Sequence, residues 1–372
     1  MHLQVEHRFA FEYDTFISES FLELRVQPKT TPQQAVASFE LAVGPPTSVH
    51  RYRDWNDNLT HHFTITKFHD RIAVAARSLV ETRLPGVAIG ALVEPPAVDP
   101  PSYTLRDFLE FGGPVKLNPA LRAAHRAIGL PPTAAIGEQV LAVGRYIHEH
   151  FEYRKNVTAY DSTTEDFLKI GGGVCQDFAH LMLGLLRLRQ IPCRYVSGYL
   201  HVERKTREPS QSHAWVELHS PTAGWVPFDP THNRAVDERY VVVGHGRHYD
   251  DVPPNKGIYR GIAKETLKAE VVTDVVPGKT VSTLREELSH IDLPVFREIP
   301  ARPPDRLVTN IADVATQQQQ QQQQEREPAL RLRPHVAGCS SLLATPLALV
   351  FCGAAPAARA RGERSRARRP SR

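Results

Sequence analysis

Cysteine is scarce in this chain, with four residues among 372. Cys175 and Cys193 lie in regions with regular hydrophobic patterns, whereas Cys339 and Cys352 lie in a compositionally biased C-terminal tail. No two of them form a Cys-x-x-Cys pair, which argues against the common zinc-binding and thioredoxin-like motifs. Because two cysteines are too few for a disulfide framework, we expect a reducing compartment and a cytoplasmic location.

Long hydrophobic runs are also few. Residues 2–13 alternate charged and apolar side chains and contain no apolar stretch typical of a signal peptide. The uncharged stretch 336–358 has the length of a membrane span, but Pro346 and two glycines interrupt it, and arginines flank it. We interpret this stretch as part of a disordered tail and expect no membrane partner.

Neither sign of charge is in large excess, since the formal net charge is only +4 and much of it comes from the arginine-rich tail. The folded part therefore shows no signal for a nucleic-acid partner. Acidic residues do not cluster as a calcium site requires, and the histidine pairs His61-His62 and His245-x-x-His248 lack carboxylates or cysteines at ligand spacing. The sequence predicts no metal and no cofactor.

Apolar residues at every second position dominate the first ~80 residues. Leu3, Val5, Phe9 and Phe11 begin this pattern, and similar short runs follow at residues 22–26, 39–43 and 72–76. Short strands at such spacing are typical of a β-sandwich or barrel. We therefore predict an N-terminal β-sandwich-like domain at residues 1–100.

The hydrophobic period changes after the prolines at positions 95–96 and 100–101. Residues 132–151 carry apolar side chains at helical spacing, so a mixed α+β domain is expected at residues 101–280. Residues 281–372 contain eight consecutive glutamines (317–324) and a tail of arginine, alanine, proline and serine. Such a composition predicts disorder.

The segment 171–180 (GGGVCQDFAH) places a cysteine where a chemical role is plausible on physical grounds. Its three glycines allow a sharp turn and a close approach of a ligand. An apolar helix is predicted to begin directly after them and to end before Pro192. Cys175 would then lie in the first helical turn, where free N–H groups and the helix dipole favour a thiolate. A small core cysteine is the competing interpretation.

A hairpin is predicted to bring a histidine and an aspartate together. Residues 212–219 and 225–229 alternate like strands, and residues 221–224 (PTAG) read as the turn between them. If the strands pair symmetrically about position 221, His213 lies directly opposite Asp229. Opposed residues share a face with Cβ atoms roughly 4.5–5.5 Å apart, which suits an imidazole–carboxylate hydrogen bond. A slip of one residue would separate them.

Four blocks of the sequence resemble the bacterial transglutaminase-like superfamily. They are residues 173–180 (GVCQDFAH), 198–199 (GY), 212–217 (SHAWVE) and 228–231 (FDPT). The strand-rich first region is similar to the N-terminal β domain that accompanies this core in many bacterial members. The resemblance extends over about residues 1–278 and implies a papain-like, transglutaminase-like α+β core.

The resemblance implies a catalytic triad in which Cys175 is the nucleophile, His213 the base and Asp229 the residue that orients the base. The implied activity is thiol acyl transfer on amide bonds of a peptide or protein, completed by water or by an amine. Gln176 and Trp215 are candidates for substrate binding or the oxyanion hole. The alternative is a non-catalytic binding or scaffolding protein that keeps this fold.

Overall fold

The computed structural model describes residues 1–97, 103–203, 212–277, 293 and 311–314. The glutamine run, Cys339, Cys352 and the uncharged stretch 336–358 lie outside the described residues. Among the residues that are described, no helix is both long and apolar enough to span a bilayer.

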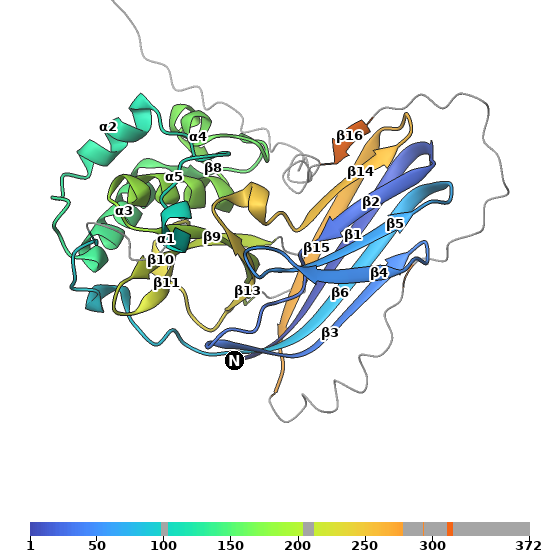
Figure 1. Cartoon of the computed structure of the whole chain (residues 1–372), viewed down its shortest axis with the longest axis horizontal. Helices are drawn as coiled ribbons and strands as arrows, with labels where there is room; N and C mark the ends of the chain where they lie inside the picture. Colours follow the sequence, from blue (N-terminus) through green and yellow to red (C-terminus); the bar gives the residue numbers. More distant parts are fainter. Residues whose placement is uncertain (98–102, 204–211, 278–292, 294–310, 315–372) are drawn as a thin grey trace, which may run out of the picture. The chain divides into compact units, whose positions relative to one another are not determined.

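Two antiparallel sheets form the strand-rich region (Figure 1). One has the strand order β15-β1-β6-β3 and the other the order β16-β14-β2-β5-β4. Their strands are β1 (His2–Ile17), β2 (Glu19–Leu24), β3 (Gln34–Gly44), β4 (Val49–Arg53), β5 (Leu59–Ile65), β6 (His69–Thr82), β14 (Asn255–Arg260), β15 (Glu265–Val275) and β16 (Ile311–Val314).

The period-two pattern produces this sandwich because it gives each strand one apolar face. Along β1, the side chains of Leu3, Val5, Phe9 and Phe11 are buried and alternate with more exposed residues. The phenylalanines pack with apolar residues of β2, β5 and β6 in one core between the sheets. Burying each such side chain contributes about 1.5–3 kcal/mol. The predicted β-sandwich-like fold is confirmed.

The C-terminal strands of the sandwich were not expected from the sequence. β15 pairs with β1 and β14 pairs with β2, so residues 255–275 extend the N-terminal sheets rather than the α+β core to which we had assigned them. The four-residue strand β16 pairs with β14 and falls within the range predicted to be disordered. The pairings of β15 with β1 and of β14 with β2 join residues more than 200 positions apart, and that of β16 with β14 joins residues more than 50 apart, which local periodicity does not report.

The α+β core contains a five-stranded antiparallel sheet of order β12-β11-β10-β9-β13. Its strands are β9 (Cys193–Leu200), β10 (His213–Ser220), β11 (Gly224–Asp229), β12 (Arg234–Ala235) and β13 (Tyr240–Gly246). The helices are α1 (Tyr103–Asp107), α2 (Pro119–Ala127), α3 (Ile136–His150), α4 (Thr164–Ile170) and α5 (Cys175–Leu188), with 3-10 turns η1 (Ile89–Ala91) and η2 (Tyr249–Asp251). This core confirms the predicted mixed fold.

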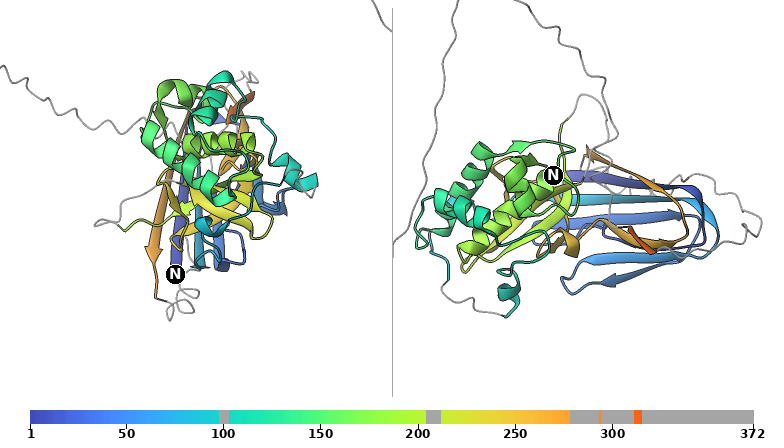
Figure 2. Two further views of the ribbon diagram at one scale, coloured as in Figure 1. Left: turned by 90° about the vertical axis from the view of Figure 1, so that its left-hand side faces the viewer. Right: turned by 90° about the horizontal axis from the view of Figure 1, so that it is seen from above.

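Helix α5 is the centre of this core. It packs on β9 and β10, and helices α2, α3 and α4 pack around it in turn (Figure 2). Its leucines at positions 181, 183, 185 and 186 are fully buried and form one cluster with Ala214, Val216 and Leu218 of β10. The helix begins at Cys175 and ends before Pro192, as the sequence predicted.

Arg187 anchors the C-terminal half of α5 although its side chain has no exposed surface. Its guanidinium donates to the carbonyl oxygens of Phe108 (3.2 Å), Glu110 (2.8 Å) and Cys193 (3.4 Å), and also to that of Arg247. One charged side chain thus satisfies four backbone acceptors from three segments.

We expect Arg187→Met to destabilise the protein by about 3–5 kcal/mol, because it removes the four hydrogen bonds that the guanidinium donates to these carbonyl oxygens. Urea unfolding monitored by circular dichroism measures the difference. Arg145→Met, at an exposed position of α3, is the control and should change the free energy of unfolding by less than about 0.5 kcal/mol. Equal effects of the two substitutions would contradict this role of Arg187.

Candidate active site

Cys175 is the first residue of α5 and is half-buried. Gly171 ends α4 in the left-handed conformation, with φ of 76°. The next strand, β8 (Gly172–Gly173), runs parallel to β7 (Glu152–Tyr153). A Cβ at Gly172 would lie 2.6 Å from the Glu152 carbonyl oxygen, so only glycine allows this approach. The glycines therefore set the position of the thiol.

The first turn of α5 is held by Asp177. Its Oδ2 atom accepts hydrogen bonds from the Val174 N–H (2.8 Å) and the Thr158 hydroxyl (2.7 Å). Burial raises the pKa of Asp177 to about 6, although these hydrogen bonds favour the charged form. As the sequence indicated, Asp177 is a carboxylate of the helix N-terminus.

The N–H groups of Cys175 and Gln176 precede the first intrahelical hydrogen bonds, in which Asp177 and Phe178 donate to the Val174 carbonyl. Val174 has no polar side chain to cap them. The side-chain amide of Gln176 instead donates to the Tyr160 carbonyl oxygen at 2.7 Å. Its suggested oxyanion or substrate-binding role stays a prediction.

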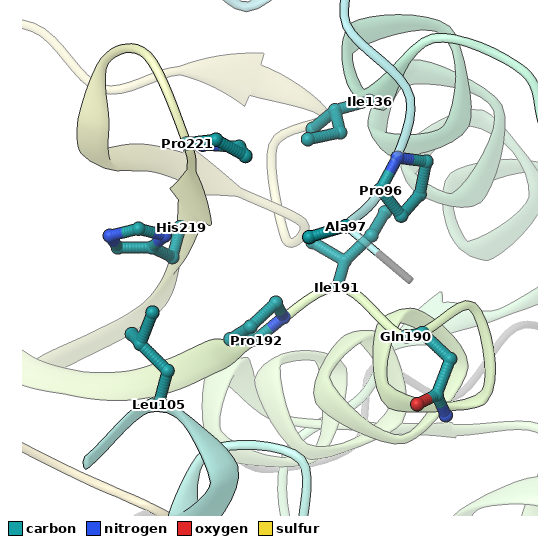
Figure 3. A pocket seen from close by; sticks show the side chains of 9 residues that line it. All are labelled: Pro96, Ala97, Leu105, Ile136, Gln190, Ile191, Pro192, His219 and Pro221. Carbon is teal, nitrogen blue, oxygen red and sulfur yellow. The ribbon is translucent and has the colours of Figure 1, made fainter. Parts of the chain in front are cut away.

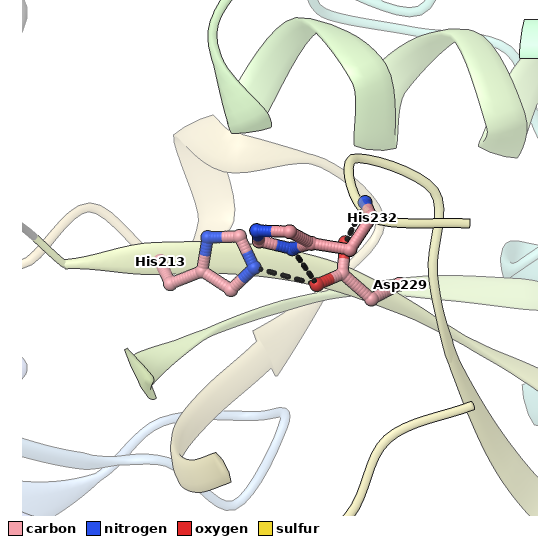
Figure 4. A group of neighbouring side chains, drawn as sticks. All are labelled: His213, Asp229 and His232. Atoms are coloured by element: carbon pink, nitrogen blue, oxygen red, sulfur yellow. Dashed lines mark hydrogen bonds and ion pairs between the residues drawn. The ribbon is translucent and has the colours of Figure 1, made fainter. Parts of the chain in front are cut away.

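His213, the first residue of β10, places its Nε2 atom 2.9 Å from Oδ2 of Asp229 (Figure 4). It also lies close enough to Cys175 for the thiol to raise its pKa. The structure thus brings the three predicted residues of the triad together.

The strand register that we assumed for this hairpin is wrong. Val216 pairs with Phe228, so continuing the ladder by one position would put Asp229 opposite Trp215 rather than His213. The turn is centred on position 222 instead of 221, which shifts the pairing by two residues. Because the side-chain period of a strand is two, His213 and Asp229 still share a face, and the imidazole reaches the carboxylate diagonally.

Asp229 has no exposed surface and accepts five hydrogen bonds. Its Oδ1 atom accepts from the backbone N–H groups of Thr231 (2.9 Å) and His232 (3.3 Å). Its Oδ2 atom accepts from His213, from Nδ1 of His232 (2.7 Å) and from the Tyr240 hydroxyl (2.7 Å). The two backbone N–H groups can only donate, and the pKa of Asp229 lies well below its usual range, so the carboxylate is ionised at neutral pH.

The pKa values of the pair follow from these contacts. Burial alone would raise the pKa of Asp229, but the hydrogen bonds from His213, His232 and Tyr240 hold it well below its usual range. Burial would likewise lower the pKa of His213, yet Asp229 and Cys175 outweigh it and raise this pKa to about 10. The imidazole is therefore set to carry a proton at neutral pH.

His232 and Tyr240 were missed at the sequence level. His232 directly follows the Phe-Asp-Pro-Thr block, whereas the alternation of the hairpin strands indicates only His213 as a partner for Asp229. Tyr240 reaches Asp229 from the start of β13, and the guanidinium of Arg234 donates to its hydroxyl at 3.0 Å. A donor three residues after an aspartate is a local signal that could identify His232 from the sequence. The contact between Tyr240 and Asp229, by contrast, can be identified only from the folded structure.

Trp215 is fully buried behind the imidazole. Its ring centroid lies 6.1 Å from that of His213 and 5.3 Å from that of Tyr240. Trp215 and Tyr240 also line a cavity of about 420 Å³, whose lining residues include neither Cys175 nor His213. The structure thus shows Trp215 as a support for His213, and its direct contact with substrate stays a prediction.

Other residues singled out from the sequence lie away from the thiol chemistry. His180 is buried and accepts the Tyr249 N–H at 3.2 Å, which agrees with the hydrogen-bonding role expected for it. Cys193 is fully buried, and burial raises the pKa of its thiol to about 11. Ile191 and Pro192, which precede Cys193, line a small pocket that has room for about one water molecule (Figure 3).

Among the described residues, one group has the composition of a metal site. Ligand atoms of His213, Asp229 and His232 lie within 4.8 Å of one another. The two imidazole nitrogens already bond to the same carboxylate oxygen, which accounts for their proximity without a metal (Figure 4). The expected absence of a metal stays a prediction.

Comparison with known proteins identifies the family that this chain resembles. Residues 99–230 match the transglutaminase-like superfamily, and residues 3–81 match the bacterial transglutaminase-like N-terminal region. An uncharacterized protein of Mycobacterium leprae is 34% identical over 290 residues, which cover 73% of this chain and 98% of that protein.

Two further similarities are more distant. A protein-glutamine gamma-glutamyltransferase of Pseudomonas aeruginosa is 29% identical over 131 residues, covering 32% of this chain and 20% of the relative. The solved structure of a "putative cysteine protease" from Cytophaga hutchinsonii has a TM-score of 0.58 at 22% identity and covers 74% of this chain and 93% of that one. The latter similarity concerns the fold.

The burial of the two described thiols predicts their reactivity. Iodoacetamide at pH near 7 should alkylate Cys175 at least about tenfold faster than Cys193, because Cys193 is inaccessible and holds its proton. Peptide mapping by mass spectrometry separates these sites from the tail cysteines. Faster labelling of Cys193 would contradict the structure.

Proposed function

Because the chain belongs to the transglutaminase-like superfamily, we propose that it is a thiol acyl-transfer enzyme acting on amide bonds of peptides or proteins. Cys175 is the nucleophile, His213 the base and Asp229 the orienting carboxylate. The observation that carries this proposal is the position of His213, which hydrogen-bonds a buried, ionised carboxylate and also interacts with the thiol.

The first half of the reaction breaks the amide bond. The proton of the Cys175 thiol resides on His213, and Asp229 stabilises this imidazolium without accepting the proton itself. The thiolate attacks the carbonyl carbon, and the oxygen that becomes negative is stabilised by the N–H of Cys175. His213 then gives its proton to the departing amine or ammonia, and a thioester to Cys175 remains.

The second half transfers the acyl group. Water yields a carboxylic acid and a free thiol, whereas a primary amine yields a new amide; in both cases His213 removes a proton from the attacking group. The gamma-glutamyltransferase relative supports an amine acceptor, and the Cytophaga hutchinsonii structure is named for hydrolysis. Both chemistries use the same thioester. A peptide or protein substrate and a cytoplasmic location belong to this proposal.

Removing the nucleophile tests catalysis against a scaffolding role. With a glutamine-containing peptide and a fluorescent amine, or with the peptide alone and an ammonia assay, Cys175→Ala should lose more than about 10³-fold of the turnover. Its melting temperature should stay within a few degrees of wild type, because Cys175 is only half-buried. Full activity in this variant would remove the catalytic role of the thiol.

The pair of His213 and Asp229 predicts a characteristic pH dependence. Turnover needs the imidazolium to protonate the leaving group, so activity should fall as the pH rises through the His213 pKa of about 10. Asp229→Asn removes the charge that raises this pKa and should move the alkaline limb to lower pH. It should also reduce kcat/KM by about a hundredfold or more.

His213→Ala should lose more activity than Asp229→Asn, since it removes both the base and the acid. Measuring kcat/KM across about pH 6–11 in the three proteins decides the roles. An alkaline limb that stays in place in Asp229→Asn would show that the carboxylate does not control the imidazole.

A further inference from the structure

We propose that His232 is a positioning residue for the reaction, a second imidazole that holds the Asp229 carboxylate in the orientation that His213 requires. This inference rests on the proposed function of Cys175, His213 and Asp229, and it adds a residue that the triad does not contain.

His232 contacts both oxygens of the carboxylate. Its backbone N–H donates to Oδ1 at 3.3 Å and its Nδ1 donates to Oδ2 at 2.7 Å (Figure 4). Two contacts on opposite oxygens resist rotation of the carboxylate about its Cβ–Cγ bond. That rotation would move Oδ2 away from His213, whose Nε2 lies 2.9 Å from the same atom.

The positions of the hydrogens follow from the chemistry of the partners. Arg234 can only donate to the Tyr240 hydroxyl, so the hydroxyl hydrogen points to Asp229. The ionised carboxylate can only accept, so Nδ1 of His232 carries a hydrogen. The charged and titratable groups around Asp229 are thus His213, His232, Tyr240 and Arg234, with Cys175 beyond His213.

The donor at Nδ1 has two consequences for the site. It offsets the burial of the Asp229 charge, because its hydrogen bond is among those that keep the carboxylate ionised. It also holds the carboxylate in the orientation in which Oδ2 faces Nε2 of His213. By contrast, the side chain of His232 is 43% exposed, so its removal leaves little buried volume empty. A loss of reactivity without a loss of stability is the expected signature.

Asparagine offers a matched substitution. Its Nδ2 is bonded to Cγ as Nδ1 is in histidine, so His232→Asn can keep the donor and lose only the rest of the ring. His232→Ala removes the side-chain donor and keeps only the backbone N–H. His148→Ala, at an exposed position on α3 remote from Asp229 in the chain, is the control.

The test compares alkylation of Cys175 by iodoacetamide, followed by peptide mapping against pH, in the full-length wild type, these three variants and His213→Ala. We expect His232→Ala to react about tenfold more slowly than wild type at neutral pH, with an unchanged melting temperature. His232→Asn should recover to within about threefold of wild type, and His148→Ala should equal it.

Two results would overturn the inference while leaving the triad intact: His232→Ala reacting like wild type, or His232→Asn reacting as slowly as His232→Ala. If Cys175 of the wild type is alkylated no faster than Cys175 of His213→Ala, the imidazole does not activate the thiol. That result would contradict the proposed function and this inference with it.

Discussion

An ionised carboxylate without contact to water is costly, by several kcal/mol, unless donors surround it. Asp229 is such a group, and its donors come from the start of β10, from the turn after β11 and from the start of β13. These segments must therefore be in place together before the charge is tolerated. The folded sheet and the ionised carboxylate depend on each other, and the imidazole that shares this charge gains its raised pKa from the same arrangement.

Hydrophobic packing sets the distance between Cys175 and His213. The helix that starts with Cys175 packs through its leucines on Ala214, Val216 and Leu218, which belong to the strand that starts with His213. A core of this kind is nearly incompressible, so the thiol and the imidazole keep their separation without a direct restraint. The glycines before the helix let the backbone approach β7 closely enough for this packing. The relative position of the thiol and the imidazole thus follows from the packing of the core.

Local patterns in the sequence predicted much of this structure. Alternation in residues 1–80, the glycines before Cys175 and the proline after α5 each act over a few residues, and the corresponding elements were found. The hairpin register was wrong by two positions because the turn residues allow more than one centre, yet the period of two kept His213 and Asp229 on one face. The donors Tyr240 and Arg234 and the pairing of β14, β15 and β16 depend on contacts between distant segments, which periodicity does not encode.

The central claim is that Cys175 carries the acyl group during turnover. It is tested most directly by acid quenching of the wild-type protein during steady-state reaction with a glutamine-type peptide, followed by intact mass measurement and peptide mapping. The account predicts an added acyl mass, without the leaving group, on the peptide that contains Cys175, and its disappearance after treatment with hydroxylamine, which cleaves thioesters. Turnover with the acyl mass on another residue, or with no covalent adduct under conditions in which acyl transfer to acceptor is slowed, would contradict it.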